Sequence, residues 1–319
     1  MPQRLENRCR LLHIPLTVGN HFERQMMKTT IFLISIFLFC NNVVGQAIND
    51  VRFNHLSFTL EYQDLEALRE SSFVQDKLGV LETRTTKVDS ITTITRNFLY
   101  GESNYLELFE TSADDPTLGF LTLVLSVDKI NGLYELKKNL DNSYQTGIRG
   151  YERNFDGVKV PWYESLSVID TSILDSAYMI QAHFWFWIMG YKTEYFEYNG
   201  YAIENDKLTS ENYLEKYASE RQNKIIKRFS GIVMKLNPDE TEYLKKFFET
   251  IGYLKLDENE YLSPEKFKFI ITERQPGDHN SLESIEFETS KEFSRKKEVM
   301  ISDHMFVIIQ GNKGHIIFN

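Results

Sequence analysis

Residues 53–60 read FNHLSFTL, and residues 65–74 read LEALRESSFV after a short polar turn. The first stretch alternates apolar with polar side chains, which is typical of a strand with one buried face. The second has apolar residues spaced three and four apart, which is typical of an amphipathic helix. Asp64 stands in the turn, where a carboxylate favours the start of a helix. We therefore predict a strand followed by a helix.

The same strand–helix pattern occurs twice more along the chain. Residues 119–127 (GFLTLVLSV) precede a helical pattern at 130–140, and residues 231–236 (GIVMKL) precede one at 240–251. Pro238 fits the first turn of the third helix, because the missing N–H of proline is not needed there. A repeat of this kind predicts a tandem array of similar modules.

Strand-like runs follow each predicted helix, so each module is expected to be a βαβββ unit. Residues 156–157 (DG) and 311–313 (GNK) are predicted to be turns between strands. The fold class is therefore α+β, with tandem βαβββ modules and a cupped, mostly antiparallel sheet. The expected domains are a leader and signal peptide at 1–45, paired modules within 46–203 (52–110 and 118–195), a linker helix at 204–229, and a third module at 230–319.

The N-terminal residues predict export. Met27 and Lys28 precede the apolar run 31–40 (IFLISIFLFC), and small residues before Gln46 suit cleavage after Gly45. We expect a signal peptide at about 27–45 and a periplasmic or secreted protein; the alternative is an uncleaved N-terminal anchor. Both cysteines, Cys9 and Cys40, lie in this leader, so the mature chain would have no disulfide and no transmembrane span.

Composition narrows the classes of partner. The chain has 319 residues, of which 42% are hydrophobic, and its formal net charge is −10. The apolar content suffices for a buried core. No basic stripe stands out, so nucleic acid is not an expected partner. The cup of the paired modules is the expected site of a small-molecule ligand.

Two short stretches resemble a known superfamily. The segments 54–58 (NHLSF) and 105–109 (YLELF) are similar to the first and last strands of a glyoxalase, or vicinal-oxygen-chelate, module, and the chain most resembles a secreted bacterial glyoxalase-like group. The resemblance implies that His55 and Glu107 bind a divalent metal and that Glu107 is catalytic. The partner module departs from the pattern, because Phe120 and Gly190 stand where further ligands are expected.

Each candidate has a plainer interpretation. His55 could be an ordinary hydrogen-bonded strand histidine, and Glu107 a solvated strand carboxylate. Aromatic residues that could line a ligand pocket could equally form a core strand; they are Tyr105, Trp162, Trp185, Trp187 and Tyr191. Two functions remain open: a metal-assisted lyase or isomerase acting at vicinal oxygens, or a non-catalytic small-molecule-binding or cell-envelope protein on the same scaffold.

Overall fold

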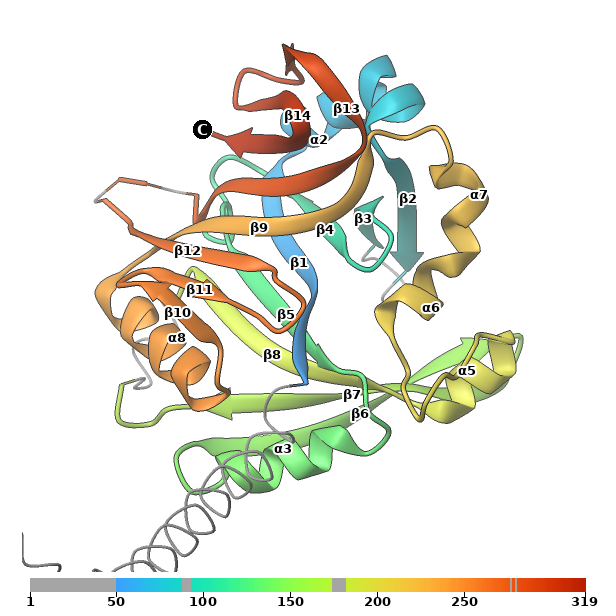
Figure 1. The fold of residues 1–319 in the computed structure, drawn as a ribbon, viewed down its shortest axis with the longest axis vertical. Coiled ribbons are helices and arrows are strands. Elements are labelled where there is room, and N and C mark those ends of the chain that lie inside the picture. The colour runs from blue at the N-terminus through green and yellow to red at the C-terminus, as the bar shows by residue number, and fades with distance from the viewer. Residues whose placement is uncertain (1–49, 88–92, 174–181, 276, 279) are drawn as a thin grey trace, which may run out of the picture. The chain divides into compact units, whose positions relative to one another are not determined.

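The computed structural model describes residues 50–87, 93–173, 182–275, 277–278 and 280–319 (Figure 1). The predicted leader and signal peptide at 1–45 lie outside the described residues. None of the helices within the described ranges has the length and apolar character needed to cross a bilayer.

An eight-stranded sheet is built from two βαβββ modules. Its strands run in the order β2-β3-β4-β1-β5-β8-β7-β6. In each module the first strand pairs in parallel with the last, β1 with β4 and β5 with β8, and the modules meet through the antiparallel pair β1–β5. The strands are β1 (Val51–Glu61), β2 (Val80–Lys87), β3 (Thr93–Tyr100), β4 (Tyr105–Thr111), β5 (Leu121–Val127), β6 (Gln145–Phe155), β7 (Val158–Ile169) and β8 (Phe184–Tyr191).

The helices of these modules follow the predicted strand–helix repeat. Helix α2 (Tyr62–Glu70) and the short π-helix η1 (Val74–Leu78) follow β1, and α3 (Gly132–Leu140) follows β5. Apolar residues of the sheet pack toward them; Leu56, for example, has no exposed surface. The α+β class with glyoxalase-like modules is therefore confirmed.

A six-stranded sheet repeats this arrangement once more. Its order is β10-β11-β12-β9-β13-β14, with β9 and β12 parallel as β1 and β4 are. Helix α8 (Pro238–Thr250) follows the first strand and begins with a capping box formed by Asn237 and Glu240. The strands are β9 (Ile226–Leu236), β10 (Leu254–Asp257), β11 (Glu260–Leu262), β12 (Lys268–Glu273), β13 (Leu282–Met300) and β14 (Met305–Phe318).

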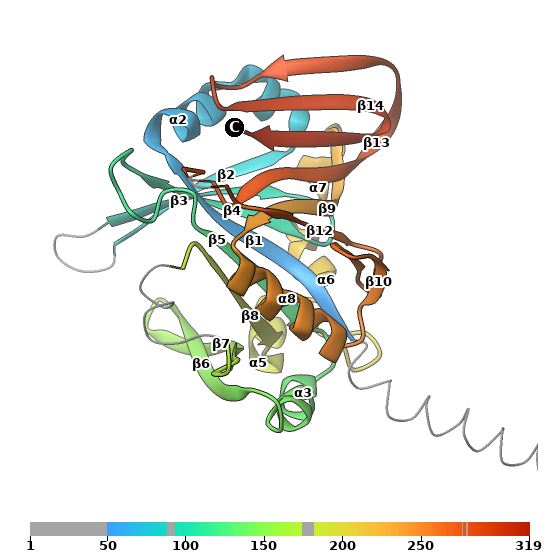
Figure 2. The same ribbon diagram turned by 90° about the vertical axis from the view of Figure 1, so that its left-hand side faces the viewer.

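The main core lies between the two sheets, and α8 occupies it (Figures 1 and 2). The ring of Phe247 packs on Phe186 of β8 with centroids 4.4 Å apart, and the ring of Phe248 packs on Phe269 of β12 at 4.8 Å. The opposite face of the eight-stranded sheet is covered by short helices: α5 (Thr193–Asn199), α6 (Ser210–Leu214), the 3₁₀-helix η2 (Glu215–Tyr217) and α7 (Ala218–Arg221). This second face carries the candidate site.

Two local expectations differ from the structure. The segment 204–229 is not one helix: helical turns cover only α6 to α7, and β9 already begins at Ile226. Asn205 and Asp206 have positive φ, which breaks a helix, and Thr209 caps the helical part. The turn predicted at 311–313 lies inside β14. The chain reverses instead between Met300 and Met305, and the positive φ of Gly311 accommodates a register shift between the two long strands.

Candidate functional site

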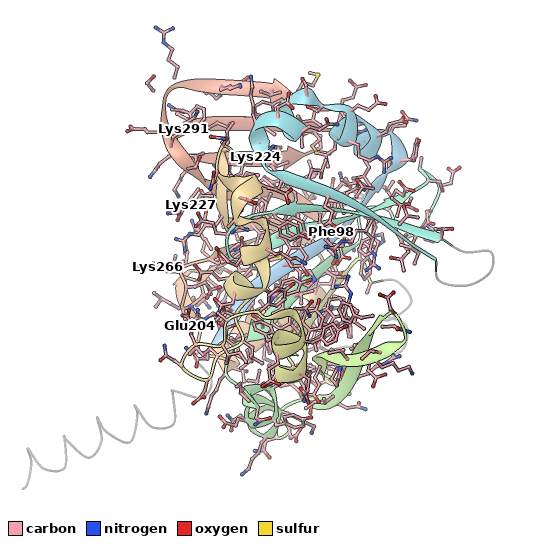
Figure 3. All side chains as sticks on the ribbon, turned by 90° about the vertical axis from the view of Figure 1, so that its right-hand side faces the viewer. Phe98, Glu204, Lys224, Lys227, Lys266 and Lys291 are labelled. Atoms are coloured by element: carbon pink, nitrogen blue, oxygen red, sulfur yellow. The ribbon has the colours of Figure 1, made fainter. Side chains whose placement is uncertain are left out.

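A cavity of about 300 Å³ lies on the helix-covered face of the eight-stranded sheet. Phe98 on this face is visible beside the strands in Figure 3. The cavity combines a wall of aromatic rings with a few charged groups, as expected of a small-molecule site. Its lining comprises His55, Arg84, Thr86, Arg96, Phe98, Tyr100, Tyr105, Glu107, Arg153, Trp162, Tyr163, Trp187, Met189, Tyr191 and Tyr213.

His55 and Glu107 meet at this cavity. They lie on the paired strands β1 and β4, where Glu107 is directly opposite Ser57. His55 Nε2 is 3.7 Å from Glu107 Oε2, and the Ser57 hydroxyl donates to the same oxygen at 3.1 Å. Arg96 of β3 donates to Glu107 Oε1 at 3.2 Å. Both side chains are buried, with the histidine 5% and the glutamate 8% exposed.

A bulge in β1 fixes the orientation of His55. The pairing of β1 with β5 shifts register between Phe53 and His55, which allows the neighbouring side chains of Asn54 and His55 to meet. His55 Nδ1 lies 2.8 Å from Asn54 Oδ1, and the Asn54 amide donates to Ser210 of α6. Because Asn54 Oδ1 accepts, Nδ1 carries the proton and the lone pair of Nε2 faces Glu107. The imidazole also stacks on Tyr105 at 4.4 Å.

Burial controls the protonation of both groups. It lowers the pKa of His55 to about 3, so the imidazole is neutral at physiological pH. Burial also raises the pKa of Glu107, although the Arg96 charge and the hydrogen bonds from Ser57 and Arg96 oppose it. The His55–Glu107 contact is therefore a neutral imidazole beside a carboxyl group, not an ion pair.

The donor set does not fit a divalent metal. Within the described residues no group of three or more His, Cys, Asp or Glu side chains could hold one, and His55 and Glu107 supply two donors. The partner strand β5 places Val124 opposite His55. Gly190 of β8 faces Leu133 of α3 instead of the cavity. The Arg96 guanidinium, moreover, already pairs with the Glu107 carboxylate, which a metal would need as a ligand.

The structure brings together most of the predicted aromatic residues. Tyr105, Trp162, Trp187 and Tyr191 line the same cavity as His55 and Glu107. Trp185 does not line it and packs against the main core.

Sequence reasoning missed the three arginines of the cavity, Arg84, Arg96 and Arg153. They come from strands β2, β3 and β6, whose side chains reach the cavity only because the sheet curves. The one signal in the sequence was the position of Arg84, which stands two residues from both Glu82 and Thr86 and so shares one face of the strand with them.

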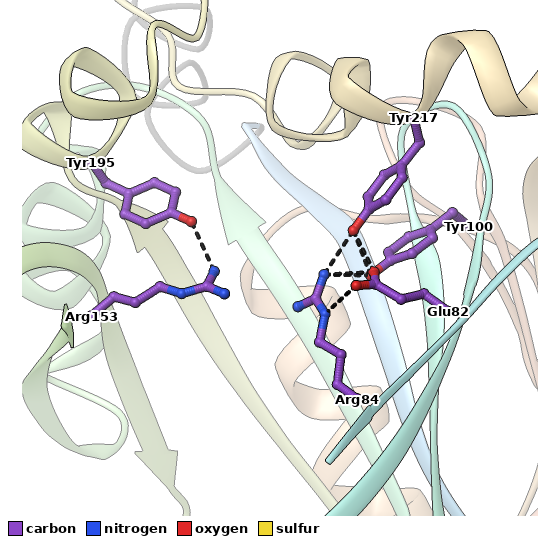
Figure 4. A network of polar contacts seen from close by, with 6 residues as sticks. All are labelled: Glu82, Arg84, Tyr100, Arg153, Tyr195 and Tyr217. Carbon is purple, nitrogen blue, oxygen red and sulfur yellow. Dashed lines mark hydrogen bonds and ion pairs between the residues drawn. The ribbon is translucent and has the colours of Figure 1, made fainter. Parts of the chain in front are cut away.

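Arg84 belongs to a polar network shown in Figure 4. Its Nε and Nη2 both donate to the Glu82 carboxylate at 2.7 Å, and Nη2 also donates to the hydroxyls of Tyr217 and Tyr100. Burial acts to raise the pKa of Glu82, but hydrogen bonds from Arg84, Tyr217 and Tyr100 hold it at about 2. Glu82 is therefore ionised and balances the charge of Arg84.

The paired βαβββ modules give the chain a glyoxalase-like fold, and an aromatic cavity lies on one face of their sheet. The chain belongs to DUF5829, a family of unknown function whose pattern matches residues 53–318. No curated protein matches it.

Several solved structures have weak similarity to this chain. A hypothetical protein from Staphylococcus aureus has 11% identity and a TM-score of 0.47, with 79% of this chain and 95% of that chain covered. A fusion of a xylose isomerase-like TIM barrel with a 4-hydroxyphenylpyruvate dioxygenase has 10% identity and a TM-score of 0.39, with 72% and 34% covered. A 4-hydroxymandelate synthase variant from Streptomyces coelicolor has 10% identity and a TM-score of 0.38, with 73% and 66% covered. One fold hosts many activities, so the function of this chain depends on the residues of its site.

Proposed function

We propose that this protein binds a small organic molecule in the aromatic cavity and moves a proton on it with Glu107, without a metal. The observation that carries the proposal is a buried carboxylate 3.7 Å from a neutral imidazole, at the wall of a cavity of about 300 Å³. A carboxyl group whose pKa is raised by burial is suited to act as a general base near neutral pH.

The proposed chemistry is proton abstraction next to a carbonyl group. Glu107 Oε2 takes the proton from carbon, and the electron pair moves to the carbonyl oxygen as an enolate. Where a carbon–carbon double bond of the substrate is conjugated with this enolate, return of the proton from Glu107 to the far end of that double bond completes an isomerisation. Where the adjacent carbon carries a leaving group, the enolate electron pair forms a carbon–carbon double bond as that group departs, and the proton passes from Glu107 to the leaving group, which completes an elimination. Arg96 and Ser57 hold the carboxylate in place, while His55 Nε2 offers an acceptor beside it.

A second candidate function is binding without turnover. The observation that favours it is the Arg96 guanidinium, which already donates to Glu107 Oε1 at 3.2 Å and weakens the carboxylate as a base. In that case the cavity would bind its ligand, and His55 and Glu107 would only orient the ligand.

Hydrogen–deuterium exchange separates the two functions. Phenylacetone, a neutral aromatic ketone with exchangeable protons next to its carbonyl, is incubated with the protein in D₂O and followed by proton NMR. We expect protein-dependent exchange that falls by about 10²-fold or more in Glu107→Gln. Glu110→Gln is the matched control, because Glu110 lies on the same strand and bonds Arg69 instead of lining the cavity.

Two outcomes of the exchange experiment would contradict the proposed proton transfer. Binding of phenylacetone with no protein-dependent exchange would leave only the binding function. Exchange that a chelator abolishes would contradict the metal-free mechanism.

Export is a separate part of the proposal and rests on the residues at 27–45. Expression of the full chain followed by mass measurement of the exported product is the test. We expect an N-terminus at Gln46, and a product that keeps the leader would contradict cleavage.

A further inference from the structure

Two arginines from opposite edges of the eight-stranded sheet line the same cavity. Arg84 lies on β2 and Arg153 on β6, the two outermost strands of that sheet. Figure 4 shows their guanidinium groups pointing toward each other. Like charges that face each other across a cavity repel unless an anion lies between them.

The positive charges of Arg84 and Arg153 are neutralised to different extents. Glu82 neutralises Arg84, whose Nη1 makes no hydrogen bond within the described ranges. Arg153 has no carboxylate within ion-pair distance among the described residues. Its Nη1 donates to the neutral hydroxyl of Tyr195 at 3.0 Å, and its guanidinium lies 5.3 Å from the ring centroid of Trp162. One full positive charge therefore remains at the cavity wall.

A lysine adds to this positive field. Lys216 Nζ lies 4.8 Å from the ring centroid of Tyr213, which lines the cavity. Burial, followed by the charges of Arg84 and Arg153, lowers the pKa of Lys216 to about 8. A chain with a formal net charge of −10 has thus gathered cations around one cavity.

We propose that the cavity selects small aromatic anions, with a carboxylate or phosphate group held between Arg153 and Arg84. A planar guanidinium matches either oxyanion with two parallel N–H donors. The rings of Trp162, Tyr163 and Trp187 supply the surface for the aromatic part. This inference rests on the proposed function in that both place the ligand in the same cavity.

The test compares matched anionic and neutral probes. Binding of phenylacetate, phenyl phosphate and neutral phenylacetamide is measured by calorimetry, with the fluorescence of the cavity tryptophans as a second readout. We expect both anions, or one of them, to bind at least 10-fold tighter than phenylacetamide. The tighter of the two anions identifies the acid group.

Substitution then assigns the preference to Arg153. Arg153→Gln is chosen over an Arg84 variant because Arg84 also holds the Glu82 network. We expect it to weaken anion binding by about 10-fold to 100-fold and to leave phenylacetamide binding unchanged, as for a lost charge-assisted hydrogen bond. The matched control is Arg295→Gln, which removes the same charge from an exposed position on β13.

The result that overturns this inference is distinct from failure of the proposed function. Equal affinity for phenylacetate, phenyl phosphate and phenylacetamide, or full anion affinity in Arg153→Gln, would overturn anion selection while leaving the cavity and Glu107 intact. Binding of none of the three probes would overturn it as well. Loss of exchange chemistry alone, with anion preference retained, would leave this inference standing.

Discussion

His55 Nε2 lies 3.7 Å from Glu107 Oε2, and the two residues come from the first and last strands of one module. The distance is too long for a hydrogen bond, and burial keeps the imidazole uncharged. A water molecule, a proton in transit or a ligand atom can therefore bridge the pair. This relationship places the proposed site on the face of the sheet that the short helices cover.

The first prediction concerns stability and pH. Burial lowers the pKa of His55 from 6.5 to about 3, so the unfolded chain binds a proton on this residue more readily than the folded one. The free energy of unfolding should therefore fall as pH drops from about 6.5 toward 3, by up to about 1.4 kcal/mol per pH unit from this group. Denaturant unfolding at a series of pH values measures it.

Replacement of the histidine isolates its contribution. His55→Gln should lose this part of the pH dependence, whereas His304→Gln, which removes an exposed histidine, should keep it. Parallel pH curves for wild type and His55→Gln would show that His55 accepts a proton freely in the folded protein.

The second prediction concerns Arg96. Burial raises the pKa of Glu107 and the Arg96 charge is the largest opposing influence, so Arg96→Gln should raise that pKa further. Carbon-13 NMR of the glutamate carboxyl groups, with Glu107→Gln to assign the signal, measures the shift. Arg69→Gln is the matched control: Arg69 pairs with Glu110, which lies on the same strand as Glu107, so its replacement should leave the Glu107 signal unchanged. An unaltered titration in Arg96→Gln would contradict the role assigned to the arginine.

The third prediction concerns packing between β13 and β14. Gly314 lies opposite Phe287, and a β-carbon at this glycine would come within 2.2 Å of the Phe287 ring. Gly314→Ala should therefore lower the free energy of unfolding by about 1–3 kcal/mol, because the ring has to move. Gly150→Ala on β6, where a β-carbon meets nothing within 4 Å, should cause no loss. Equal stability of the two variants in urea would contradict this packing.

The fourth prediction concerns the start of α8. The Asn237 side chain accepts from the Glu240 backbone N–H at 2.9 Å, and the Glu240 carboxylate accepts from the Asn237 backbone N–H at 2.9 Å. Asn237→Ala should cost about 0.5–2 kcal/mol in thermal or urea unfolding. Asn139→Ala, at an exposed position inside α3, should not destabilise the protein. A loss of stability that is the same in both variants would argue against the cap.

Local patterns predicted the elements well where one rule dominated. The alternation in residues 53–60 gave the strand β1, and the turn at Asp156 and Gly157 separates β6 from β7 as expected, with positive φ at both residues. The prediction of a hairpin turn at Gly311 is wrong, because a glycine with positive φ accommodates a register shift as readily as a turn.

The candidate site was harder to predict than the fold. His55 and Glu107 were singled out through a resemblance, but nothing in the spacing of residues showed that their side chains face one cavity. The bulge at Asn54, the contact with Ser210 of α6 and the curvature that brings Arg84 to Arg153 all join residues distant in sequence.

The sequence by itself determined the strand–helix repeat and hence the α+β class, because side-chain periodicity is a local property of the chain. The tertiary structure alone decided which donors meet. It showed that Val124 lies opposite His55, that Arg96 occupies the carboxylate, and that arginines from both edges of the sheet share one cavity. These facts depend on strand register and sheet curvature, which are set by packing across the whole fold.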